Sequence, residues 1–128
     1  MGYYEKSMAA YGDYLYVLFR VLVGIVFFLH GWMKFAGGMA QGLMLAAALI
    51  EVVGGAALVL GLFTRLVATV TVLEMIVAFF KAHFPQGLNP LANHGEPAVL
   101  FFAAFLVLIV YGSRKWSLER TLLKKEFF

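Results

Sequence analysis

Long apolar stretches, separated by short polar breaks, run along most of this chain. The stretch 43–63 is apolar except for Glu51, and the stretch 66–82 follows it after only Thr64 and Arg65. A helix needs about 20 apolar residues to cross a bilayer core, so each stretch is of spanning length. The pair therefore predicts a hairpin of two membrane-spanning helices, with a carboxylate near the middle of each arm.

Two further apolar stretches extend this pattern to four helices. The first lies before the Gly37-Gly38 break, and the last follows a loop rich in proline, glycine and asparagine, residues that terminate helices and form turns. We expect an all-α, polytopic membrane four-helix bundle over 14–112, preceded by a polar segment, 1–13, and followed by a basic amphipathic surface tail, 113–128. The predicted helices are 14–34, 43–63, 66–82 and 97–112.

Lysine and arginine are distributed unevenly between the two sides of this topology. One side has only Lys34 and Lys81, both at helix ends. The other side carries Lys6, Arg65, Arg114, Lys115, Arg120, Lys124 and Lys125. The positive-inside rule then predicts cytoplasmic N- and C-termini. We expect a multi-pass protein of the bacterial inner (plasma) membrane.

Composition excludes several classes of function. With 63% hydrophobic and 13% charged residues, the chain differs from soluble domains, in which about 25% of residues are charged. The net charge of +3 comes from basic residues near the ends, which suits an anionic leaflet rather than nucleic acid. The absence of cysteine excludes disulfides, thiol catalysis and iron–sulfur ligation by this chain. No hydrolase constellation or phosphate-binding loop is present.

Small residues in the predicted helices favour close packing. Gly24 and Gly31 occupy the first helix, and the second contains Gly54, Gly55, Gly61 and the alanine run Ala46–Ala48. Glycine and alanine let the backbones of membrane helices approach each other, because they present little or no side chain at the interface. We interpret these glycines as packing positions rather than as parts of a chemical site.

Ionisable side chains inside the predicted helices are the candidates for chemistry, because such groups are costly in a bilayer and normally face a bundle interior. With a rise of about 1.5 Å per residue, Arg20 is expected level with Glu74, and His30 level with Glu51. We therefore predict the buried pairs Arg20–Glu74 and His30–Glu51. The candidate polar cluster, with the outer helix ends included, is Arg20, His30, Lys34, Glu51, Glu74, Lys81 and Glu96.

Four interpretations of these polar residues remain open. They could fix helix register through buried ion pairs, or form a proton path through Glu74, Glu51 and His30. They could also hold the head of a quinone or another amphipathic molecule, whose tail would lie against Phe27, Phe28, Trp32, Phe79 and Phe80. A metal site at His83, His94 and Glu96 matches no specific ligand spacing, and we predict no metal.

Several short motifs, in a fixed order, resemble the DoxX family. They are Arg20-x3-Gly24, His30-Gly31-x2-Lys34, Glu51-x2-Gly54-Gly55, Gly61-Leu62-Phe63-Thr64-Arg65, Glu74-Met75-x2-Ala78, Gly95-Glu96, and Gly112 followed by Ser117-Leu118-Glu119. The family ending more usually has a second glycine and Asp, where this chain has Ser113/Arg114 and Glu119. The resemblance covers roughly Tyr14–Glu119 and implies a small four-helix inner-membrane protein.

The resemblance also implies classes of function. Related proteins occur as membrane subunits of a thiosulfate:quinone oxidoreductase, and others associate with thiol-redox or oxidative-stress systems. The wider fold group includes cysteine-based oxidoreductases, whose chemistry this cysteine-free chain cannot perform.

Three hypotheses for function follow. The first is a small membrane subunit or accessory protein of a redox system. The second is a stand-alone oxidoreductase that binds a quinone or another small molecule through Arg20, His30, Glu51 and Glu74. The third is a small transporter or proton-conducting protein. The sequence assigns no cofactor, and a quinone is the candidate. The expected partners are the lipid bilayer and either a larger membrane redox complex or further copies of this chain.

Overall fold

The computed structural model describes residues 2–38, 41–114 and 116–123. All regular secondary structure within these ranges is helical, which confirms the predicted all-α class. A π-helical turn, η1 (Phe79–His83), and a 3₁₀ turn, η2 (Phe84–Gln86), continue the third helix. The α-helices are α1 (Tyr3–Ala36), α2 (Leu43–Leu60), α3 (Thr64–Ala78), α4 (Glu96–Tyr111) and α5 (Leu118–Leu123).

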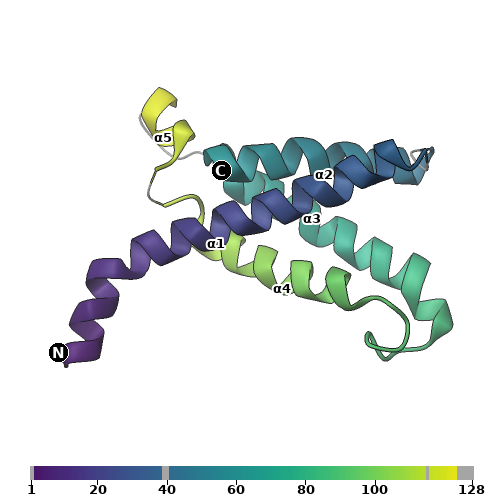
Figure 1. Ribbon diagram of the computed structural model, residues 1–128, viewed down its shortest axis with the longest axis horizontal. Helices are drawn as coiled ribbons and strands as arrows, with labels where there is room; N and C mark the ends of the chain where they lie inside the picture. The colour runs from purple at the N-terminus through teal and green to yellow at the C-terminus, as the bar shows by residue number, and fades with distance from the viewer. Residues whose placement is uncertain (1, 39–40, 115, 124–128) are drawn as a thin grey trace.

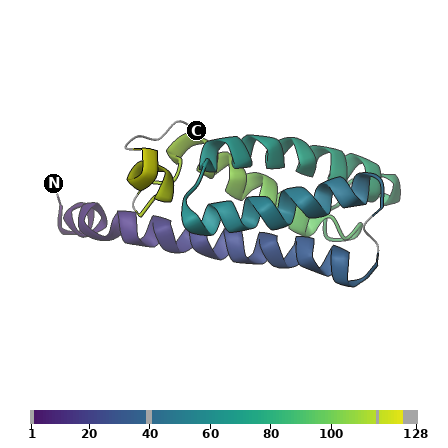
Figure 2. The same cartoon turned by 90° about the horizontal axis from the view of Figure 1, so that it is seen from above.

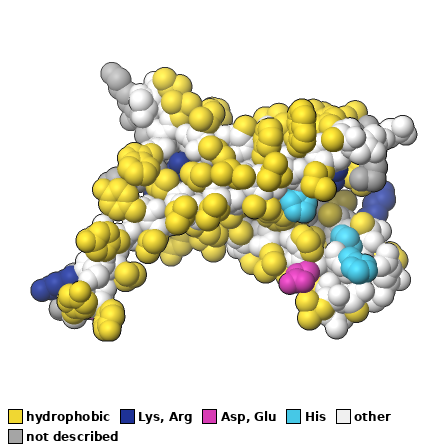
Figure 3. Space-filling view, in the orientation of Figure 1, with side chains coloured by type: hydrophobic (Ala, Val, Ile, Leu, Met, Phe, Trp, Pro, Cys, Tyr) yellow, Lys and Arg dark blue, Asp and Glu magenta, His cyan; other side chains and the backbone are white. Residues whose placement is uncertain are grey.

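Three of these helical segments are long and apolar enough to cross a membrane. They are Tyr3–Ala36, Leu43–Leu60 and Thr64–Gln86, and the shorter apolar helix α4 has 16 residues. Hydrophobic side chains are spread over much of the face shown in Figure 3. Lipid can solvate such a surface, whereas water cannot do so without cost. The protein is therefore a membrane protein whose environment is the lipid bilayer.

α1 begins at Tyr3 rather than at residue 14, so the predicted polar segment 1–13 is helical as far as it is described. This segment contains no proline, and nothing in it interrupts a helix that the apolar stretch behind it stabilises. The Glu5 carboxylate accepts a hydrogen bond from the backbone N–H of Gly2 at 2.7 Å, which satisfies a donor at the helix start. α1 consequently extends past the rest of the bundle at its N-terminal end (Figure 1).

α1 and α2 pack side by side along their length, as the two perpendicular views show (Figures 1 and 2). Their backbones touch at Gly24 and Gly55, where a Cβ atom on Gly55 would lie 2.6 Å from the Gly24 carbonyl oxygen. A Cβ atom on Gly31 would lie 2.7 Å from the Cβ of Glu51. These distances leave no room for a side chain, and they confirm that Gly24, Gly31 and Gly55 are packing positions. Gly61 instead ends α2 in a left-handed backbone conformation.

α3 and α4 form a second pair, which diverges from α1 and α2 toward the end that carries the loop 87–95 (Figure 1). The two pairs meet in a core around Phe27, which is completely buried. The Phe27 ring lies 4.9 Å from that of Phe105 and 5.3 Å from that of Phe101, between centroids. Edge-to-face contacts of this kind hold α1 against α4.

Candidate functional site

Three ionisable side chains from three helices meet between α1, α2 and α3. Lys34 near the end of α1 donates a hydrogen bond to Glu51 Oε2 of α2 within an ion pair. The two side chains are 21% and 6% exposed. The Glu74 carboxyl group of α3 lies near Glu51 and Lys34, and its buried Oε2 atom has no hydrogen-bond partner among the described residues. We call Lys34, Glu51 and Glu74 the carboxyl–lysine cluster.

The register of the α2–α3 hairpin explains why the two carboxyl groups meet. Glu51 precedes Gly61 by ten residues and Glu74 follows Thr64 by ten, so both lie at the same distance from the turn. The turn is short because Gly61 and Phe63 both adopt left-handed backbone conformations, with φ of 73° and 48°. α3 therefore begins at Thr64, two residues earlier than predicted, and this places Glu74 deeper in the bundle.

The predicted pairs Arg20–Glu74 and His30–Glu51 are wrong. Glu51 pairs with Lys34 instead, because Gly31 lets α2 approach α1 closely and Lys34 lies one turn beyond Gly31 on the same face. Glu74 lies in the same cluster because the register of the α2–α3 hairpin places it beside Glu51. The symmetric spacing of the two glutamates about the Gly61–Thr64 turn was the signal in the sequence that identifies their contact.

Arg20 belongs to a separate buried network, which holds the segment after α4. Its side chain is 1% exposed. Its guanidinium donates to the backbone carbonyl oxygens of Ser113, at 2.6 Å, and Trp116, at 3.2 Å. Carbonyl groups of an irregular segment need such donors where water is absent. Arg20 thus serves to fix the chain after α4 rather than to neutralise Glu74.

The same segment binds the turn between α2 and α3. The Gly61 carbonyl oxygen accepts hydrogen bonds from Ser117 Oγ, at 2.8 Å, and Ser113 Oγ, at 3.3 Å. The fully buried Glu119 carboxylate accepts one from the backbone N–H of Phe63 at 3.0 Å. The prediction of a surface tail over 113–128 is therefore wrong for these three side chains, while Lys115 and residues 124–128 lie outside the described residues.

Ser113, Ser117 and Glu119 were not among the candidate site residues. The sequence predicts them to be exposed, because serine and glutamate next to basic residues are usually solvated. Their signal was the ending motif, Gly112 followed by Ser117-Leu118-Glu119, at a fixed distance from the Gly61–Arg65 turn motif. The structure shows that the two motifs form one hydrogen-bonded unit.

His30 and Glu96 lie in a groove between α1 and α4, away from the carboxyl–lysine cluster. The groove has a volume of ≈ 390 Å³. The His30 ring makes an edge contact with Phe101, with 5.3 Å between centroids. Neither His30 nor Glu96 has a hydrogen-bond partner among the described residues. The lining residues are Leu22, Val23, Val26, His30, Glu96, Pro97, Leu100, Phe101 and Ala104.

Lys81 is exposed and takes no part in the cluster. Next to it, His83 Nδ1 lies 3.1 Å from the Asn93 carbonyl oxygen. The buried Asn93 side chain organises the loop by donating to the Gly87 carbonyl at 2.7 Å and accepting from the Gly95 N–H at 2.8 Å. His83 and Asn93, which are outside the candidate polar cluster, therefore shape the loop before α4.

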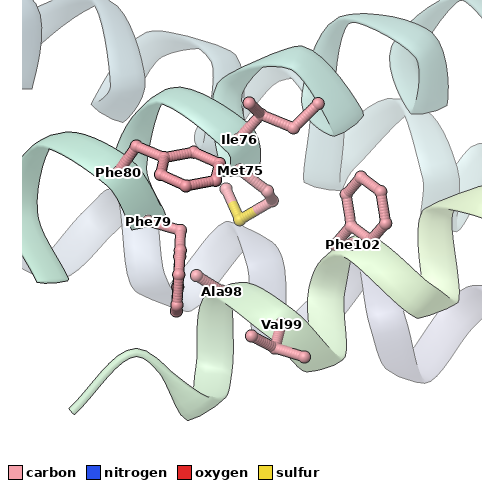
Figure 4. A pocket seen from close by; sticks show the side chains of 7 residues that line it. All are labelled: Met75, Ile76, Phe79, Phe80, Ala98, Val99 and Phe102. Atoms are coloured by element: carbon pink, nitrogen blue, oxygen red, sulfur yellow. The ribbon is translucent and has the colours of Figure 1, made fainter. Parts of the chain in front are cut away.

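The aromatic residues expected along a ligand tail are dispersed. Phe27 lies in the core and Trp32 is 56% exposed. Phe79 and Phe80 line an apolar cavity of ≈ 160 Å³ between α3 and α4, where Phe79 and Phe102 flank Ala98 and Met75 (Figure 4). This cavity contains no polar side chain, so it offers packing but no group for chemistry.

The fold and these sites define a small helical membrane protein with ionisable groups buried between its helices. The chain belongs to the DoxX family, whose model matches residues 15–84. An "Uncharacterized protein" of Haemophilus influenzae is 33% identical over 94% of this chain and 99% of its own length. No solved structure matches.

Two further relatives carry more descriptive names. The "Putative oxidoreductase CatD" of Bacillus subtilis is 30% identical over 80% of this chain and 83% of its own length. The "Inner membrane protein YqjF" of Escherichia coli is 33% identical over 83% of this chain and 90% of its own length. The family assignment thus agrees with the membrane location that the helices require.

Proposed function

We propose that this protein is a small membrane component of a redox system, as a subunit or accessory protein. Its carboxyl–lysine cluster holds the polar head of a quinone-like molecule. Lys34 can donate a hydrogen bond to a carbonyl oxygen, and the carboxyl groups can accept one from a hydroxyl group. The cluster therefore suits a head that alternates between these two groups as it is reduced and oxidised.

The observation that carries this proposal is the Oε2 atom of Glu74, which is buried without a hydrogen-bond partner beside the Lys34–Glu51 ion pair. A buried polar atom without a partner costs about 1–3 kcal/mol, and such atoms are rare in folded proteins. A ligand that donates to Glu74 would remove this cost. The three side chains come from three helices, so the ligand would also join them.

Two further observations support a redox role. The Bacillus subtilis relative, which is of similar length, is named "Putative oxidoreductase CatD". This chain has no cysteine, so its electrons would have to pass through a bound molecule or a partner protein. A subunit or accessory role agrees with the relative's name and with the absence of cysteine, because it requires no catalytic side chain from this protein.

Gentle detergent extraction followed by native mass spectrometry tests the proposal. We expect either a quinone-sized adduct or a larger redox assembly with the wild-type chain. Glu74→Gln and Glu51→Gln should lose the adduct, whereas Glu5→Gln, outside the cluster, should keep it. A protein with neither adduct nor partner would contradict the proposal, as would an adduct that both cluster variants retain.

A second candidate is proton conduction, favoured by the proximity of the Glu51 and Glu74 carboxyl groups inside the bundle. Adjacent carboxyl groups can exchange a proton across a hydrogen bond. A complete path across four helices would require further copies of this chain. Proton flux into liposomes that disappears in Glu74→Gln, with no quinone adduct in the wild type, would replace the redox proposal with this one.

The orientation proposed for this function has both termini in the cytoplasm of a bacterial cell. Arg65 at the α2–α3 turn and Lys6 near the N-terminus support it through the positive-inside rule. The carboxyl–lysine cluster would then lie in the outer half of the inner membrane.

A further inference from the structure

The groove between α1 and α4 is a candidate binding site that shares no residue with the carboxyl–lysine cluster. Its two walls run antiparallel, with Leu22 and His30 at the ends of one and Ala104 and Glu96 at the ends of the other. Eight residues separate the two ends on each helix, which corresponds to a groove about 12 Å long. The volume of ≈ 390 Å³ lies within the usual range for small-molecule sites.

Most of the groove is apolar and faces the bilayer. Leu22 is 51% exposed, Val26 45% and Leu100 62%. Side chains exposed at this level contact lipid in a membrane protein, so a hydrocarbon chain can enter the groove directly from the bilayer. Close packing of a chain against these walls supplies attraction by van der Waals contact, which is the force that remains between apolar groups in lipid.

The polar groups lie together at one end of the groove, where α4 begins. His30 and Glu96 face this end without hydrogen-bond partners among the described residues. Histidine and acidic side chains gather near the start of α4 on the face shown in Figure 3. A carboxylate attracts a cation, while an imidazole N–H and the N-terminal end of a helix favour an anion. This end therefore offers one site for each sign of charge.

We propose that the α1–α4 groove binds a phospholipid with a zwitterionic, ammonium-bearing headgroup. One acyl chain lies along Leu22, Val26 and Leu100, the ammonium group pairs with Glu96, and the phosphate accepts a hydrogen bond from His30. A lipid with an anionic headgroup and no cation would place its charge against Glu96 without compensation. The groove consequently selects between headgroups and not between acyl chains.

Native mass spectrometry with defined lipids tests this inference. Delipidated protein in detergent is titrated with dioleoyl phosphatidylethanolamine and with dioleoyl phosphatidylglycerol, which share their acyl chains. We expect the wild type to bind the ethanolamine lipid about fivefold more tightly, the effect of one partly exposed charge pair. Glu96→Gln should remove this preference, and Glu5→Gln, at the far end of α1, should retain it.

A second variant tests whether the groove binds the acyl chain of the lipid, independently of the headgroup. Leu100→Trp places an indole in the groove at an exposed position, so the bundle should fold and bind both lipids more weakly. Equal affinity of the wild type for the two lipids would overturn the inference. So would an ethanolamine preference that persists in Glu96→Gln, or lipid binding unaffected by Leu100→Trp. Because His30 and Glu96 lie outside the carboxyl–lysine cluster, these outcomes do not depend on the proposed redox function.

Discussion

The carboxylate of Glu119 accepts a hydrogen bond from the backbone N–H of Phe63 at 3.0 Å, although 56 positions separate the two residues. Phe63 immediately precedes α3, so this contact places a buried negative charge at the N-terminus of a membrane helix. Such a position is favourable because the helix dipole and the free N–H groups there attract anions. The segment after α4 is thereby an integral part of the bundle.

Glu119→Ala should destabilise the protein by about 1–3 kcal/mol, because the Phe63 N–H loses its partner in a buried location. The free energy of unfolding in detergent, measured by denaturant titration, gives the magnitude. Glu5→Ala is the matched control: Glu5 is exposed and bonds only to the neighbouring Gly2 within the described residues. Equal effects of the two substitutions would show that the contact between α5 and the turn contributes nothing.

Gly55→Ala should separate α1 from α2. Its Cβ atom would lie 2.6 Å from the backbone of Gly24 and of Phe28, and backbone atoms cannot move aside as a flexible side chain can. We expect a loss of about 1–3 kcal/mol. In contrast, Gly12→Ala meets no atom within 4 Å and should stabilise α1 by about 0.5–1 kcal/mol. Thermal denaturation of both variants should give shifts of opposite sign.

Lys34→Met should cost about 3 kcal/mol, because it leaves the buried Glu51 carboxylate without its cation. Combining it with Glu51→Leu should recover much of this loss, since the double variant also removes the carboxylate with which Lys34 forms its ion pair. A double-mutant cycle on unfolding free energies measures the coupling. Additive losses would mean that the pair is not coupled in the membrane.

The proposed orientation can be tested without background labelling, because the natural chain has no cysteine. Gln86→Cys, at the last residue of η2 and next to the loop 87–95, should react with a membrane-impermeant thiol reagent in intact cells. Tyr3→Cys, 80% exposed at the start of α1, should react only after the membrane is permeabilised. The opposite labelling pattern would place the termini outside and invalidate the positive-inside assignment.

The depth of Glu74 in the bundle depends on the residue at which the third helix begins. Glu74 was predicted near Arg20 because the third helix was expected to begin at 66. The left-handed conformation of Phe63 shortens the turn and moves Glu74 to the level of Glu51. An error of two residues displaces a side chain by about 3 Å and rotates it by about 200° around the helix. Correctly identified helices therefore still produced incorrect ion pairs.

The sequence by itself determined that this is an all-helical membrane protein of the DoxX family, and that Gly24, Gly31 and Gly55 lie at helix contacts. These conclusions depend on local properties, namely apolar length, small residues and short motifs. Only the tertiary structure decided that Lys34, Glu51 and Glu74 meet, that Arg20 binds carbonyl groups after α4, and that Glu119 is buried. Each of those contacts joins separate segments of the fold, so it depends on turn conformation and on how closely the backbones approach.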